Sequence, residues 1–224
     1  MYGGSGGRLW TFDLATGASS EVGPTDISSF PSLAFSPDGR LFGASNGTDQ
    51  LYEIDPLTGA VTPGAELDIN LATSGMDFAS DGTLYLVEGG TDALYTVDLE
   101  TGATEVVLEF DFNFSATDIA IVPDGTIFVS ARVNSNVANA PDTLFSVDLE
   151  TESVRRIGVM PGVTSAALGA HSFASTKIDI RPGLFPNTIN LASAGTVEVA
   201  LLSTDRLNAR EVDPSSLRFG RTGE

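Results

Sequence analysis

Residues 94–98 read Leu-Tyr-Thr-Val-Asp, and a Thr-Gly pair follows at 101–102. The same pattern, aliphatic, aromatic, any residue, apolar and Asp, occurs four times, at 9–13, 51–55, 94–98 and 144–148. Successive aspartates lie 42, 43 and 50 residues apart, and the first three copies are each followed by Thr-Gly, the fourth by Thr-Glu. Self-similarity at a nearly fixed period predicts a repeat architecture.

A second signature interleaves with the first. Asp-Gly pairs stand at 38–39, 81–82 and 124–125, with both steps equal to 43 residues. Glycine accepts the positive φ of tight hairpin turns, so each pair is expected to join two short strands. The first complete copy then has four strands, at 32–36, 40–44, 50–55 and 60–63.

The predicted strands carry apolar residues on both faces, as in Leu84-Tyr85 and Leu94-Tyr95. A lone four-stranded sheet cannot bury both of its faces, whereas sheets stacked around an axis can. The sequence therefore predicts an all-β propeller built from blades of about 43 residues. The predicted blades are three complete copies and an N-terminal half-blade of two outer strands, at 27–67, 70–110, 114–160 and 2–22.

Over residues 2–160 these units resemble the blades of the broad bacterial propeller families of the YVTN, NHL and TolB kind. The resemblance implies the fold, and it implies no particular activity because the shared turn motifs are structural.

The number of blades is open at this point. Residues 163–174, with Val163–Leu168 as an inner strand, could complete the N-terminal half-blade and close a four-bladed ring. Alternatively the chain is a fragment of a longer propeller, which is the interpretation that we favour. A truncated array would leave an exposed strand edge at 9–13.

The composition of the sequence changes at about residue 175, which we take as a domain boundary. Residues 1–175 hold 24 acidic and 5 basic residues, whereas residues 176–224 hold 6 of each. Short apolar runs separated by Pro, Asn and Gly predict part of a β-sandwich in 176–224. This segment resembles a module attached to secreted and surface proteins of bacteria and archaea, which implies an extracellular or cell-surface location. The calcium-binding segment common in that family is not reached before Glu224.

Composition excludes several function classes. The net charge of −19 disfavours nucleic acid, because phosphate binding needs clustered cations, and it disfavours anionic membranes for the same reason. The chain has no Cys, which excludes disulfides and thiolate metal sites, and a single histidine, His171, which excludes a histidine-rich metal site. No apolar run approaches the length of a membrane span.

Aligning the copies on the Asp-Gly turns places Asp77 and Asp118 on the inner strands, where they are the only acids. They are the best candidates for binding a polar ligand or a channel cation, with Ca²⁺ the cation considered, although solvated or backbone-bonded carboxylates are the simpler interpretation. Asp49, Asp92 and Asp142 recur before the third strands and are expected to stabilise turns. The third complete copy has an Asn-rich insertion at 132–142, which could be a recognition loop or a surface elaboration.

Two functions follow from these observations. The favoured one is a non-catalytic binding or scaffold region of a secreted or cell-surface protein, with an unknown protein or carbohydrate ligand and no cofactor. The alternative is a calcium-dependent hydrolase resembling propeller lactonases, with Asp77 and Asp118 holding Ca²⁺ in the channel. That site would need several converging ligands, and the sequence offers two acids.

Overall fold

The computed structural model describes residues 1–161 except 14, 28, 29, 31, 123 and 134–139, together with 178–180, 199–201 and 210. The chain divides into two compact units, residues 1–171 and residues 172–224. All regular elements of the described residues are β-strands, so the predicted all-β class is confirmed.

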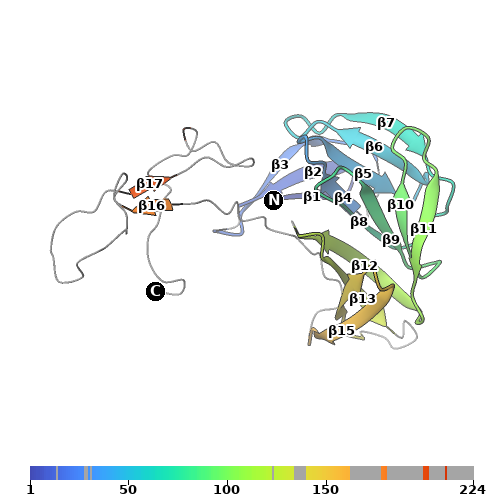
Figure 1. The fold of residues 1–224 in the computed structure, drawn as a ribbon. Helices are drawn as coiled ribbons and strands as arrows, with labels where there is room; N and C mark the ends of the chain where they lie inside the picture. The colour runs from blue at the N-terminus through green and yellow to red at the C-terminus, as the bar shows by residue number, and fades with distance from the viewer. Residues whose placement is uncertain are drawn as a thin grey trace. The chain divides into compact units, whose positions relative to one another are not determined.

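The first unit is a four-blade β-propeller arrangement of small antiparallel sheets (Figure 1). Blade 2 contains β4 (Ser32–Phe35), β5 (Leu41–Ser45), β6 (Gln50–Ile54) and β7 (Val61–Glu66). Blade 3 contains β8 (Ser74–Phe78), β9 (Leu84–Glu88), β10 (Ala93–Val97) and β11 (Thr104–Glu109). Blade 4 contains β12 (Phe114–Ile121), β13 (Ile127–Val133), β14 (Thr143–Asp148) and β15 (Ser153–Val159).

Blade 1 has three strands, β1 (Tyr2–Ser5), β2 (Arg8–Phe12) and β3 (Ser19–Pro24), where the sequence indicated two. They correspond to the second, third and fourth strands of the other blades, because β2 carries the repeat at 9–13. The additional strand β1 pairs with β2 in antiparallel register, Gly3 opposite Trp10. Gly3 and Gly4 have no side chains, so this strand lacks the apolar alternation that marks the others. A Cβ on Gly3 would lie 3.0 Å from the Phe12 ring, and one on Gly4 would lie 3.3 Å from Phe30 Cβ. Neighbouring aromatic side chains therefore cover the positions where β1 has none.

The repeated aspartates at the ends of the third strands stabilise the turns that follow them. Asp98 Oδ1 accepts hydrogen bonds from the backbone N–H groups of Thr101 and Glu100, both at 2.9 Å. These two bonds, that from Thr101 first, hold the pKa of this exposed carboxyl below its usual value. The same pair of bonds recurs at Asp13, Asp55 and Asp148. The Asp-x-x-Thr motif is thus a turn device, and it explains why the aspartate repeats with the fold.

The apolar core lies between the blades, with one buried cluster at each of the three junctions. The third strand contributes side chains to two junctions, because successive side chains point to opposite faces of the sheet. In blade 3, Tyr95 and Val97 pack into the cluster shared with blade 2, while Leu94 packs into the cluster shared with blade 4. Stacking of the sheets therefore buries both faces of an inner blade, as the repeat predicted.

Glycines allow the outer parts of neighbouring blades to approach closely. A Cβ on Gly23 of β3 would lie 2.0 Å from the Thr58 carbonyl oxygen in the turn of blade 2. A Cβ on Gly102 in the turn of blade 3 would lie 1.9 Å from the Glu66 carbonyl oxygen of blade 2. The Thr-Gly motif therefore sets the spacing of the first two junctions.

In the second unit, β16 (Ile178–Ile180) pairs antiparallel with β17 (Val199–Leu201). These are the strands that the structure describes there, and the β-sandwich stays a prediction. The predicted inner strand at 163–168 lies outside the described residues. Among the residues that the structure describes, no helix has the length and apolar character to cross a membrane.

Candidate functional site

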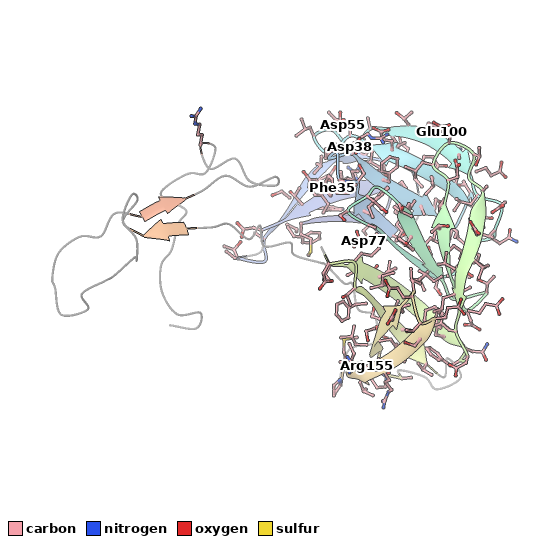
Figure 2. The ribbon with its side chains drawn as sticks, in the orientation of Figure 1. Phe35, Asp38, Asp55, Asp77, Glu100 and Arg155 are labelled. Carbon is pink, nitrogen blue, oxygen red and sulfur yellow. The ribbon has the colours of Figure 1, made fainter. Side chains whose placement is uncertain are left out.

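Asp77 lies on β8, close to the centre of the propeller arrangement (Figure 2). Its Oδ2 accepts a hydrogen bond from the backbone N–H of Ile121 on β12 at 2.8 Å, and its Oδ1 accepts one from Phe78 N–H at 2.9 Å. Burial raises the pKa of Asp77, and the two hydrogen bonds oppose that rise. The carboxylate thus connects the inner strands of blades 3 and 4.

Asp118 lies on β12, the inner strand of blade 4, directly against blade 3. A Cβ on Gly75 of β8 would lie 2.4 Å from Asp118 Cα and 2.8 Å from its Oδ1. That carboxylate oxygen also accepts the backbone N–H of Ile119 at 2.9 Å. Only a glycine leaves room for this approach, so Gly75 and Asp118 are sterically matched across the junction.

The contacts of Asp77 and Asp118 do not create a metal site among the described residues. Within the described part of the chain, no group of three or more His, Cys, Asp or Glu side chains could hold a metal ion. Both carboxylates accept backbone hydrogen bonds, and the geometry gives no support to the lactonase-like hydrolase. The ligand-binding role of Asp77 and Asp118 stays a prediction.

The side chains of the recurring aspartates Asp49 and Asp92 bind the segments that lead into the next blade. Asp49 Oδ1 accepts the backbone N–H of Leu71, and Asp92 Oδ1 accepts that of Phe114, at 2.8 and 2.9 Å. In both cases the donor lies 22 residues further along the chain, where the inner strand of the following blade begins. Both aspartates have positive φ, of 50° and 54°. They hold the connection between two blades, which is more than a local turn.

Asp142, the third member of this series, is fully buried. Its backbone oxygen accepts the N–H of Met160 at 2.8 Å, as the Asp92 oxygen accepts that of Phe110. Its Oδ1 lies 3.8 Å from Arg132 Nε. The central part of the predicted recognition loop, 134–139, and His171 lie outside the described residues.

Glu88 is the residue that the sequence did not reveal. Its side chain is fully buried at the end of β9. Oε1 accepts backbone N–H groups of Ala72 and Thr73, at 2.9 and 3.3 Å, and Oε2 accepts those of Gly90 and Thr91, both at 2.8 Å. One carboxylate thus fixes the strand that enters blade 3 and the loop between β9 and β10. Such a set of hydrogen bonds compensates the cost of burying a carboxylate.

The residues held in this way form one edge of the propeller, which we call the loop edge: residues 46–49, 70–73, 89–92 and 111–113. Asn46 Nδ2 also donates to the Ala72 carbonyl at 3.3 Å, so loops of blades 2 and 3 are joined directly. Asn46, Thr48, Asn70 and Asn113 are exposed on this edge. The loop edge is a rigid, exposed surface of polar side chains and backbone groups, suited to binding by hydrogen bonds.

No protein-family model matches the sequence, and no curated protein sequence matches it. The structure is similar to a chain in the crystal structure of a nidogen–laminin complex, with a TM-score of 0.55 and 10% identity over 73% of this chain and 62% of that chain. It is also similar to a protein of unknown function from Bacteroides thetaiotaomicron, with a TM-score of 0.53 and 13% identity over 72% and 48% of the two chains.

TolB from Acinetobacter baumannii aligns with a TM-score of 0.48 and 19% identity, over 68% of this chain and 38% of TolB. The chain therefore spans less than two thirds of each of these proteins. At such identities the likeness shows the propeller fold alone, because a fold of this kind hosts many functions.

Proposed function

We propose that this chain is a non-catalytic binding or scaffold region of a secreted or cell-surface protein, and that its loop edge binds a protein or carbohydrate ligand. A propeller fold is consistent with a binding or scaffold role. The observation that carries the proposal is the fixing of the loop edge by Asp49, Glu88 and Asp92 through backbone hydrogen bonds.

Rigid loops favour binding because less conformational entropy is lost when the ligand docks. The buried carboxylate of Glu88 is engaged with four backbone N–H groups, which gives it a structural role at this edge. The exposed amides Asn46 and Asn70 offer both donors and acceptors, which suits sugar hydroxyls and peptide backbones.

The secreted or surface location rests on the resemblance of residues 176–224 to a surface-protein module. The net charge of −19 supports a ligand other than nucleic acid.

The test is a binding screen of the labelled chain against an immobilised oligosaccharide array and an array of extracellular proteins. Hits are quantified with the wild type, with Asn70→Arg on the loop edge, and with Ser80→Arg. Ser80 is exposed in the Asp81-Gly82 turn at the opposite edge of the same blade, so the two variants add the same charge. We expect Asn70→Arg to weaken binding by about tenfold or more, and Ser80→Arg to leave it unchanged.

The proposal is contradicted by equal losses in both variants, by binding that neither variant affects, or by the absence of any binding on both arrays. Turnover of a bound oligosaccharide would contradict its non-catalytic part.

A further inference from the structure

Each junction in the propeller joins two defined surfaces. The surface of a blade that faces the next blade, which we call its tail face, carries the Leu of the repeat, the second residue of the third strand. The surface that faces the preceding blade, its head face, carries the aromatic and the following apolar residue. Three junctions use these surfaces in the described structure, between blades 1 and 2, 2 and 3, and 3 and 4.

The head face of blade 1 is not covered as the other three are. The two apolar head positions of the third strand are 1–7% exposed in blades 2, 3 and 4, at Tyr52, Ile54, Tyr95, Val97, Phe145 and Val147. Trp10 and Phe12 stand at these positions in blade 1, and both are partly exposed. Met1, which precedes β1 and whose carbonyl oxygen accepts the N–H of Phe12, is 66% exposed. Among the described residues, nothing covers this surface as a blade would.

The tail face of blade 4 shows the complementary deficit. Leu9, Leu51 and Leu94 occupy the tail position of the third strand in blades 1, 2 and 3, and all are at most 2% exposed. Leu144 is the equivalent residue of blade 4, and it is partly exposed.

The glycines on the two open faces match those of the closest junction. Gly23 on the tail of blade 1 meets the turn of blade 2, where a Cβ on Gly59 would lie 2.9 Å from the Gly23 carbonyl. The equivalent of Gly23 in blade 4 is Gly158, and the equivalent of Gly59 in blade 1 is Gly17. A Cβ on Gly158 or on Gly17 would meet no atom of the described residues within 4 Å. Gly158 and Gly17 could therefore make, with another chain, the contact that Gly23 and Gly59 make within this one.

Both open faces also carry charged residues. Arg155 lies on β15 (Figure 2), opposite Ser146 and on the tail face with Leu144 and Gly158. It makes no ion pair among the residues described, in a unit with a large excess of acids. The head side of blade 1 carries Glu21 opposite Trp10, where it is ion-paired with Arg8, and its turn begins with the exposed Asp13. The Asp13 carboxylate is therefore the negative charge on this side that would attract an approaching arginine.

We infer that the tail face of blade 4 binds the head face of blade 1 in a second copy of this chain. The contact repeats the blade-to-blade junction that the fold already forms three times, and it goes beyond the proposed ligand binding because it uses the blade faces. It is heterologous, since each copy contributes a different surface. Such contacts close into a ring when the rotation between copies permits, and otherwise extend.

The experiment measures the weight-average mass of the whole chain by sedimentation over a range of concentrations. The wild type is expected to rise above the mass of one chain as its concentration increases. Gly158→Glu blocks the tail with bulk and a negative charge, and Ser19→Arg blocks the head with bulk and a positive charge facing Arg155. Each variant alone is expected to stay at the mass of one chain.

Mixing the two variants is the decisive measurement. The Gly158→Glu chain keeps an intact head and the Ser19→Arg chain keeps an intact tail, so the mixture is expected to form a complex of two chains. Ser80→Arg, which makes the same substitution away from both faces, is expected to associate as the wild type does. Retention of the cooperative melting of Trp10 fluorescence in each variant shows that the blades are folded.

The inference is overturned if the wild type keeps the mass of one chain up to its solubility limit, as it would if residues of the same chain covered both faces. It is also overturned if the single variants still associate. A mixture that fails to associate would show that the contact, if any, is not head to tail.

Discussion

The inner blades and the outer faces of the first and last blades are built from the same repeat, yet they differ in burial. Leu94 in blade 3 is fully buried between two sheets, and Leu144 at the same position of blade 4 is partly exposed. The chemistry of the two residues is identical, so the neighbouring sheet alone makes the difference. The repeats are therefore stabilised by contacts between neighbouring sheets, because no single sheet can bury both of its faces by itself.

The three junctions themselves are not equivalent. In the turn of the second junction Gly102 meets the Glu66 carbonyl, whereas the turn of blade 4 has Glu152 at the equivalent position, with φ of 51°. A side chain at this position requires more room than the 1.9 Å that Gly102 leaves. The third junction instead fills its space with Leu108 and the aromatic cluster of Phe110, Phe112, Phe114 and Phe145. Close backbone approach and large side chains are two ways to join the same two surfaces.

The largest expected effect separates Gly23 from Gly158. Both are in extended fourth strands at the same repeat position, but a Cβ on Gly23 would lie 2.0 Å from the Thr58 oxygen and one on Gly158 would meet nothing. We expect Gly23→Ala to reduce the free energy of unfolding by about 3 kcal/mol, because two backbones must move apart. Gly158→Ala is expected to change it by less than about 0.5 kcal/mol. Urea titration followed by Trp10 fluorescence measures both.

The two glycine variants must be compared at a concentration where sedimentation shows single chains, so that self-association does not contribute. Equal free energies for the two variants would show that the first junction relaxes without cost.

The second prediction concerns the leucines on the tail faces of blades 3 and 4. Leu94→Ala removes a fully buried side chain from the cluster between blades 3 and 4, and it is expected to cost about 3 kcal/mol. Leu144→Ala removes the same atoms from a partly exposed site and is expected to cost about 1 kcal/mol or less. The measurement is again the urea midpoint and slope for each variant. A cost at Leu144 equal to that at Leu94 would mean that the open face is covered in solution.

The sequence predicted the parts of the fold that recur and failed where they do not. Leu94, Tyr95 and Asp98 each recur in four copies, and their strand, burial and turn were predicted from that periodicity. Strand β1 was missed because Gly3 and Gly4 have no side chains to alternate. The number of strands in blade 1 therefore became clear only from the pairing of β1 with β2.

The candidate site was less predictable for a physical reason. Glu88 stands where blades 2 and 4 have Ser45 and Ala131, so alignment of the repeats gives it no signal, and its burial depends on four N–H groups from two separate segments. Asp77 was placed on the inner strand from the sequence, but its bond to Ile121 depends on the distance between blades. Contacts of this kind arise from packing, which the pattern of one strand does not encode.

The smallest expected effect tests the junction carboxylate Asp77 against the turn carboxylate Asp98. Burial raises the pKa of Asp77 above 3.8, so the folded state binds its proton more tightly than the unfolded state does. The stability that this tighter proton binding contributes is therefore fully present below the ordinary pKa of 3.8, and it is lost as pH rises through the raised pKa of the folded state. Backbone N–H groups lower the pKa of Asp98, so its contribution is present above 3.8 and is lost as the solution is made more acidic.

Over a pH range from about 2 to about 7, Asp77→Asn should gain stability relative to the wild type as pH rises above about 4, whereas Asp98→Asn should lose relative stability mainly as pH rises from about 2 to about 4. The measurement is a series of urea titrations of the two variants and the wild type across that range. Asparagine keeps the shape of each side chain, and one amide oxygen still accepts an N–H, so the change with pH is the informative quantity. Parallel curves for Asp77→Asn and the wild type would contradict this prediction, because they would show that folding leaves the pKa of Asp77 unchanged.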